Sequence, residues 1–221
     1  MFLKDIEIFR GVRERNDKGE TLEEFLENYD PKKYDMPSHT VDMIVFRCSE
    51  KLRSLDQNLQ ILLIQRKNHP CIGMWGTPGG FVDLREDLID AAKRELEEET
   101  GVKGLPMQQL LTYGKYDLDP RWRVITTPFL SLVEGDIPVK AGDDALDAAW
   151  FDVSISKNED IYHLEMKKDD WNIWADVREI KEDHSLLQQT RYELMKSYHM
   201  DECHYCIITQ ALAYLKEQLK K

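Results

Sequence analysis

The sequence predicts a single α/β domain in which a sheet is flanked by helices. Two observations support this class. Short stretches of alternating or continuous apolar residues, typical of β-strands, recur between positions 41 and 153. Stretches typical of helices lie between and after them, at 86–100 and 201–219. The chain has 221 residues, 42% of them hydrophobic, which is enough to bury one core.

The composition excludes several classes of protein. The apolar fraction excludes global disorder, and a net charge of −12 at pH 7 argues against broad binding to nucleic acid or to an anionic membrane. No stretch approaches the roughly 20 apolar residues that span a bilayer, and the N-terminus lacks the apolar core of a signal peptide. Four cysteines do not suggest a disulfide scaffold. We therefore expect a cytoplasmic protein with no membrane or nucleic-acid partner.

Residues 1–38 are polar, and we expect them to form an arm packed on the body of the protein. The arm contains one short helical signal at 21–26, where Thr21 is a suitable N-cap. The body, 39–221, is interpreted as one domain.

The first part of the body is expected to contain five strands. They lie at about 41–46, 59–64, 108–116, 124–133 and 148–153. A charged loop, 49–58, joins the first two strands as a hairpin, and a glycine-rich turn at 73–80 leads into a helix at 86–100. Trp150 and Phe151 in the last strand should be buried.

The second part of the body begins with residues 156–198, which are interpreted as an inserted hairpin followed by a helix. The hairpin spans 161–181 and turns near Lys168-Asp169-Asp170, and the helix is placed at about 185–196. A closing helix at 201–219 carries an apolar stripe at helical spacing. The stripe consists of Ile208, Leu212, Leu215 and Leu219.

Three carboxylates are predicted to lie on one face of the helix at 86–100. Glu95, Glu98 and Glu99 stand at positions i, i+3 and i+4, so their side chains are neighbours and repel one another. A hard divalent cation such as Mg²⁺ or Mn²⁺ removes this repulsion, because it prefers oxygen ligands. For such a stretch taken alone, a solvated acidic helix with pairs such as Arg94–Glu98 is the alternative.

The residues around this cluster fit a cation site. The Gly79-Gly80 pair permits close approach of the backbone, and its carbonyls or amides can face a cation or a phosphate. Glu86 lies at the start of the helix, where the helix dipole favours negative charge. Arg94 is placed to pair with Glu86 or Glu98 and to fix their rotamers, and Gly101 ends the helix.

From Gly80 to Val102 the chain matches every fixed position of the Nudix box, G-x5-E-x7-R-E-U-x-E-E-x-G-U, where U is apolar. The chain therefore resembles the Nudix hydrolase superfamily. The resemblance implies a Nudix fold, an α/β/α sandwich with a mixed sheet, extended here by a hairpin and two C-terminal helices. It implies Mg²⁺-dependent hydrolysis of a nucleoside diphosphate linked to another moiety, with Mn²⁺ as a substitute. The implied metal ligands are Glu95, Glu98, Glu99 and Gly80, and the implied catalytic residues include Glu98, Glu86 and Arg94.

A narrower resemblance concerns the segments 37–43, 62–67 and 119–121, which are similar to ADP-ribose pyrophosphatase-like Nudix proteins. This group includes the Nudix domain of NAD-metabolism regulators, which carry a winged helix after that domain and often a damaged box. Here the box is whole, and we expect no winged helix after Lys221. The resemblance implies hydrolysis of ADP-ribose to AMP and ribose 5-phosphate by a homodimer. A non-catalytic ADP-ribose sensor and a hydrolase of damaged nucleoside triphosphates are the alternatives.

Further site residues are expected outside the box. The general base is placed in the acidic loop 142–145, at Asp144 ahead of Asp143, with Glu159 or Asp160 as the second choice and Glu98 as a ligand that doubles as the base. Two arginines and two glycines are candidates for contacts with the substrate, because arginine binds phosphate through two parallel hydrogen bonds. They are Arg66, Arg121, Gly79 and Gly80.

Cysteine and histidine residues gather near the start of the closing helix. Cys203 and Cys206 form a C-x-x-C pair, with His199 and His204 close by. A zinc site needs four converging ligands, and a fourth is not evident on the shared helix face. Packing of these side chains in the helix interface is therefore favoured over zinc binding.

Overall fold

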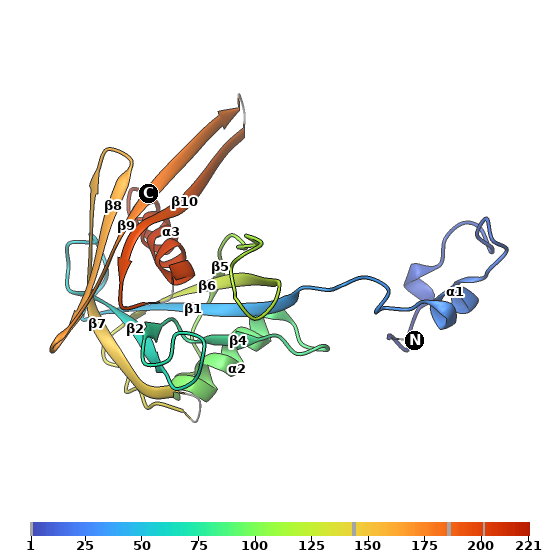
Figure 1. Ribbon diagram of the computed structural model, residues 1–221, viewed down its shortest axis with the longest axis horizontal. Helices are drawn as coiled ribbons and strands as arrows, with labels where there is room; N and C mark the ends of the chain where they lie inside the picture. Colours follow the sequence, from blue (N-terminus) through green and yellow to red (C-terminus); the bar gives the residue numbers. More distant parts are fainter. Residues whose placement is uncertain (1, 143–144, 185–186, 201) are drawn as a thin grey trace. The chain divides into compact units, whose positions relative to one another are not determined.

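The computed structural model describes residues 2–142, 145–184, 187–200 and 202–221 (Figure 1). The chain divides into two units, Met1–Met36 and Pro37–Lys221. The first unit contains a 3₁₀ helix, η1 (Glu7–Phe9), and α1 (Leu22–Asn28). Thr21 caps α1 as predicted, because its hydroxyl accepts the N–H of Glu24 while the Glu24 carboxylate accepts the N–H of Thr21. The packing of the arm on the body stays a prediction.

The second unit is built on one mixed sheet of ten strands among the described residues. The strands are β1 (Ser38–Cys48), β2 (Leu59–Arg66), β3 (Trp75–Gly76), β4 (Gly79–Phe81), β5 (Gln108–Gln109), β6 (Val124–Glu134), β7 (Ala145–Asn158), β8 (Ile161–Lys168), β9 (Trp171–His184) and β10 (Leu187–Tyr198). Their order is β10-β9-β8-β7-β2-β1-β6-β5, with β3 beside β2 and β4 beside β1. β1 and β6 are parallel, and the other pairs are antiparallel.

The central strand β1 is buried on both faces. Val41, Met43 and Val45 pack with residues of α2 (Leu88–Thr100), whereas Ile44 and Phe46 pack with residues of α3 (Glu202–Gln218). Because alternate side chains of a strand point to opposite faces, the two helices cover opposite faces of the sheet. This confirms the predicted arrangement of helix, sheet and helix.

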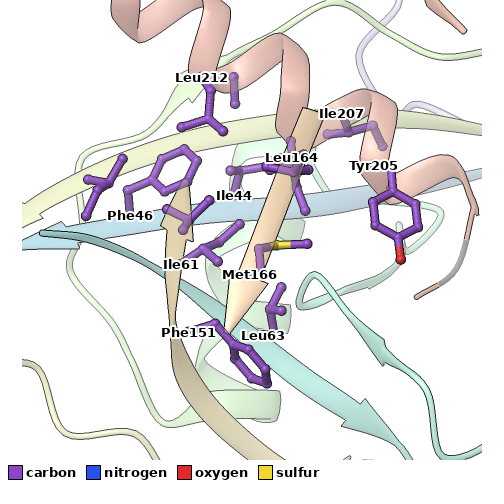
Figure 2. Close-up of a cluster of buried hydrophobic side chains, with 14 of the residues drawn as sticks. Ile44, Phe46, Ile61, Leu63, Phe151, Leu164, Met166, Tyr205, Ile207 and Leu212 are labelled. Atoms are coloured by element: carbon purple, nitrogen blue, oxygen red, sulfur yellow. The ribbon is translucent and has the colours of Figure 1, made fainter. Parts of the chain in front are cut away.

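The larger core lies between α3 and the sheet. Figure 2 shows Ile207 and Leu212 of α3 meeting side chains of β1, β2, β7 and β8 in one cluster. Phe151 is fully buried and Trp150 nearly so, as predicted, and the indole N–H of Trp150 donates to the Ile137 carbonyl over 3.0 Å. The docking of α3 in this core brings its first turn close to β3.

The prediction of a helix at 185–196 is wrong, because its residues from 187 onward belong to β10. Leu, Gln, Glu, Met and Lys favour helices, but this local preference is overridden by pairing with β9 over nearly the whole strand. The alternation Thr190-x-Tyr192-x-Leu194, in which Tyr192 and Leu194 pack on the core, was the signal for a strand. A single helix, α3, therefore follows the hairpin among the described residues, and its predicted position is correct.

The predicted hairpin at 161–181 is confirmed as β8 and β9, with a left-handed residue, Asp169, in its turn. Because β8 pairs with β7, the hairpin continues the main sheet (Figure 1). The strand expected at 108–116 is mostly absent, because β5 holds only two residues. Its partner β6 contains Pro128 opposite Leu110, and proline has no N–H to extend the ladder. Across the described residues, no helix combines the length and apolar character that a membrane span requires.

Candidate active site

α2 places the acidic cluster beside the sheet. The helix buries Ala92 and Leu96 against β1, which turns the neighbouring positions toward β4. It begins after Asp87 and ends at Gly101, whose φ of 71° lies in the left-handed region, as predicted for a C-terminal glycine. The Gly101 N–H donates to the Glu97 carbonyl over 2.8 Å, which closes the last turn.

A cleft of about 470 Å³ lies where α2, β1, β4 and the first turn of α3 meet. It gathers most of the predicted site residues although they are far apart in the sequence. Its lining includes Arg66, Gly79, Gly80, Arg94, Glu95, Glu99 and Arg121. Glu86 and Glu98 lie outside this lining but are linked to it through Arg94. Asp144 and Asp143 lie outside the described residues, and Glu159 and Asp160 form the turn between β7 and β8.

Arg94 joins the acidic residues of the box at 80–102, which is called the signature below. Its guanidinium donates two hydrogen bonds to the Glu86 carboxylate, over 2.9 and 2.8 Å. It also donates to Glu95 over 2.6 Å, to Glu98 over 3.2 Å and to the Phe81 carbonyl over 3.0 Å. The hydrogen bonds from Arg94 lower the pKa of Glu86, so Glu86 is a fixed anion. Arg94 thus holds the rotamers of three carboxylates.

Glu99 turns toward the backbone of the glycine pair. Its Oε2 accepts the N–H of Gly79 over 2.8 Å. Burial raises its pKa to about 7, with further contributions from the negative charges of Glu95 and Asp42, while Gly79 and Arg66 act in the opposite direction. Burial also raises the pKa of Glu95. Two carboxylates that resist ionisation in one cleft indicate a place where a positive charge is favourable.

The glycine pair is required by the close approach of its neighbours. A methyl group at Gly80 would overlap the carboxylate of Glu95, and one at Gly79 would overlap the Val41 carbonyl. The predicted close approach of the backbone is therefore confirmed. The space that a side chain would fill at Gly80 is instead faced by carboxylate oxygens.

The three signature carboxylates do not converge on one point. Glu95 and Glu98 both pair with Arg94, and 59% of the Glu98 side chain is exposed, whereas Glu99 turns toward Gly79. Within the described part of the chain, no three His, Cys, Asp or Glu side chains form a group arranged to hold a metal ion. The carboxylate and carbonyl oxygens around Gly80 are nevertheless the kind of ligand that Mg²⁺ prefers.

The two predicted substrate-binding arginines are held in fixed orientations at the cleft. Arg66 donates its Nε–H to the Pro70 carbonyl over 2.8 Å. Arg121 forms two hydrogen bonds with the Asp119 carboxylate, over 3.0 and 2.7 Å, and lies 5.3 Å from the centre of the Phe81 ring. Fixed guanidinium groups lose little conformational entropy when they bind a phosphate.

Sequence reasoning missed a buried polar cluster at the floor of the cleft. Asp42 of β1 accepts hydrogen bonds from the hydroxyls of Thr77 and Thr126, and His204 Nε2 lies 3.3 Å from its Oδ1. A charged residue, Asp42, within the otherwise apolar run 41–46 was the available signal. His204, considered above as a zinc ligand, contacts Asp42 and the Thr77 N–H instead.

The raised pKa of Glu99 predicts a pH-dependent cost to stability. A carboxyl group whose pKa rises from 4.5 to about 7 on folding stabilises the protein below pH 4.5, and this contribution is lost as the pH rises through 7. The loss is about 3 kcal/mol. With a chelator present, Glu99→Gln should therefore raise the melting temperature by several degrees at pH 8 and much less at pH 5.

The matched control is Glu97→Gln on the same helix. The Glu97 side chain is half-exposed and pairs with Lys103, so its replacement should shift the melting temperature little and equally at both pH values. A Glu99→Gln shift that is the same at pH 5 and pH 8 would contradict the burial of an uncompensated carboxylate.

Comparison with known proteins agrees with the geometry. The family described as NUDIX domain matches residues 38–169, which is more than half of the chain. The "ADP-ribose pyrophosphatase" of Methanocaldococcus jannaschii is 39% identical over 129 residues, covering 57% of this chain and 69% of that protein. The "ADPR responsive transcriptional repressor NtrR" of Acinetobacter baylyi is 41% identical over 112 residues, covering 49% of this chain. The matched part is only 42% of that repressor.

Solved structures share the fold. A MutT/nudix family protein from Enterococcus faecalis superposes with a TM-score of 0.68 at 32% identity, over 90% of this chain and 70% of that one. The NUDIX domain of Shewanella oneidensis NrtR, complexed with ADP ribose, gives a TM-score of 0.54 at 34% identity, over 60% of this chain and 84% of that domain. The matched segment, these neighbours and the intact signature around α2 show that the chain belongs to the Nudix family.

Proposed function

We propose that the protein hydrolyses the diphosphate bond of ADP-ribose to AMP and ribose 5-phosphate, with Mg²⁺ as its cofactor. The observation that carries this proposal is the cleft in which Glu95 and Glu99 share the lining with Arg66 and Arg121. Such a site combines oxygen ligands for a cation with groups that bind phosphate. The likeness to a protein named ADP-ribose pyrophosphatase supports the choice of substrate.

The residues that would hold the cation are the three signature carboxylates and one carbonyl. They are Glu95, Glu98, Glu99 and Gly80. A bound Mg²⁺, or Mn²⁺ in its place, neutralises negative charge on a diphosphate and lowers the pKa of bound water. The Glu95 and Glu99 carboxylates, whose pKa values are raised in its absence, fit such a partner.

The other site residues would bind the diphosphate or orient the carboxylates. Arg66 and Arg121 would pair with the diphosphate oxygens, and the Gly79 N–H fixes the direction of the Glu99 carboxylate. Arg94 holds Glu86, Glu95 and Glu98 in place. For removal of a proton from the attacking water we propose Asp144 or the half-exposed Glu98.

Incubation with ADP-ribose and Mg²⁺ tests the proposal. AMP and ribose 5-phosphate should form in equal amounts, separated by anion-exchange chromatography, and a chelator should stop the reaction. An absence of turnover across a panel of compounds that contain a nucleoside diphosphate would reject it. The same assay identifies a nucleoside triphosphate pyrophosphohydrolase, because that activity releases pyrophosphate.

A second function, that of an ADP-ribose sensor, is favoured by one observation. A relative at 41% identity is named as an ADPR-responsive repressor. In this case the protein would bind ADP-ribose tightly in the presence of Mg²⁺ without hydrolysing it, which calorimetry together with product analysis would show. The signature from Gly80 to Val102 is intact, including all four of its glutamates and Arg94, and this supports the enzyme instead.

The proposal extends to the state of the protein in the cell. We place it in the cytoplasm as a homodimer that binds neither membrane nor nucleic acid, in keeping with its net charge of −12. Light scattering at micromolar concentration should give twice the chain mass of 26.0 kDa. A mass of one chain would reject the dimer and leave the hydrolytic proposal unchanged.

A further inference from the structure

A buried pair of side chains connects α3 to the floor of the cleft. Asp42 and His204 are each less than one-tenth exposed, and both belong to the lining. His204 Nδ1 accepts the Thr77 N–H over 3.2 Å, and Nε2 lies 3.3 Å from Asp42 Oδ1. Because Nδ1 accepts the Thr77 N–H in this arrangement, Nε2 is the ring nitrogen that can donate to Asp42.

The pair holds Thr77 by two independent bonds. The Thr77 N–H donates to His204, and the Thr77 hydroxyl donates to Asp42 Oδ1 over 3.2 Å. The chain then passes through Pro78, whose carbonyl accepts the Met43 N–H over 2.7 Å, to Gly79. Gly79 is the register partner of Asp42, and its N–H holds Glu99. A continuous set of contacts therefore runs from α3 to Glu99.

The packing around this pair leaves little freedom. A methyl group at Gly76 would lie 2.9 Å from the His204 ring, so the ring rests directly on the backbone of β3. Trp75 forms an isolated β-bridge with Met200 just before α3, and the backbone N–H of Trp75 donates to the His199 carbonyl over 3.3 Å. The start of α3 is thus fixed to the strand that leads into the glycine pair.

We propose that His204 and Asp42 are positioning residues for the hydrolytic site: they hold Thr77, and through it the Gly79 N–H, where that N–H orients Glu99. A buried acidic group with a histidine is costly, and apolar residues of the same volume would stabilise the core as well or better. The pair contacts Thr77, two residues before Gly79, and apolar residues could not make these hydrogen bonds. The expected effect on kcat rests on the proposed function, whereas the expected effect on the Thr77 and Gly79 amides does not.

Two substitutions separate the two bonds of His204. In His204→Asn the side-chain oxygen reaches the place of Nδ1 and keeps the acceptor for Thr77, but the contact with Asp42 is lost. In His204→Gln the amide nitrogen reaches the place of Nε2 and keeps the donor to Asp42, but the acceptor is lost. Because the Thr77 N–H leads directly to Gly79, His204→Gln should impair the site more than His204→Asn.

The kinetic readout is the separation of kcat from KM. For His204→Gln we expect kcat for ADP-ribose to fall by about 10- to 100-fold, with KM nearly unchanged, because misplacement of a site group by about 1 Å has effects of this size. His204→Asn should retain most of kcat. The control is Leu212→Ala, which disturbs the buried face of the same helix away from the cleft. Its kcat per folded molecule should equal that of the wild type.

A second readout does not depend on hydrolysis. Amide hydrogen exchange measured by NMR should be faster at Thr77 and Gly79 in His204→Gln than in Leu212→Ala, when both are compared at equal global stability. Equal protection of the two amides in these variants would overturn the proposal, even if no substrate is turned over. An unchanged kcat in His204→Gln, with an active wild type, would overturn it as well. Loss of turnover in the wild type alone would instead reject the proposed function.

Discussion

Replacing Glu99 by glutamine is expected to lower kcat/KM for ADP-ribose by at least about 1000-fold, which corresponds to roughly 4 kcal/mol of lost transition-state stabilisation. The amide keeps nearly the same shape, and its oxygen can still accept the Gly79 N–H. What it loses is the negative charge of a buried oxygen atom that we propose as a cation ligand. The loss should appear in steady-state assays at saturating Mg²⁺, with the variant folded and monodisperse.

The control for this effect is again Glu97→Gln, which removes an equal charge from the same helix. Glu97 pairs with Lys103 outside the cleft lining, so its replacement should change kcat/KM by no more than about twofold. If both variants lost activity equally, the effect would come from the net charge of α2 and not from a cation ligand. If Glu99→Gln retained full activity, the proposed role of Glu99 would be wrong.

The second large effect is expected from Gly80→Ala, which should lower kcat by about 100-fold. The added methyl group would overlap the Glu95 carboxylate. Glu95 would have to leave its position beside Arg94, or the turn would have to move away from α2. Either change displaces the Glu95 carboxylate, a proposed cation ligand, without removing any charge. Steady-state kinetics with ADP-ribose, together with circular dichroism to show an intact fold, measures this effect.

Gly114→Ala is the matched control for a methyl group added to a glycine. At Gly114 the new methyl would lie 3.9 Å from the Arg123 guanidinium and 4.0 Å from Ile125, which are ordinary contacts. Its activity should stay within about twofold of the wild type. An active Gly80→Ala variant would show that the close approach to Glu95 is not needed for hydrolysis.

The features of the site that could be predicted from the sequence are those set by local spacing. The position of Gly101 fixes the end of α2, and the i, i+3 and i+4 spacing fixes the shared face of Glu95, Glu98 and Glu99. The apolar positions at 41–46 likewise predict a strand, and the structure adds that this strand, β1, is buried on both faces. Local patterns of this kind are enough to predict the fold class and the acidic residues at the centre of the site.

The features that were missed depend on partners distant in the sequence. β10 is a strand because β9 lies beside it, although its residues favour a helix. The contact of His204 with Asp42 and Thr77 joins α3 to β1 and to the turn before β4, and no spacing rule relates these positions. The detailed directions of the carboxylates were also missed, because Arg94 pairs with Glu95 as well as with Glu86 and Glu98.

The proposed function requires the signature carboxylates to hold a divalent cation in the cleft. Crystals grown with Mn²⁺ and measured for anomalous scattering test it directly. We expect an anomalous peak bounded by the carboxylates of Glu95 and Glu99 and by the Gly80 carbonyl, and no peak there in crystals of Glu99→Gln. Crystals that show no peak between these groups, under conditions in which Mn²⁺ supports hydrolysis of ADP-ribose, would contradict it.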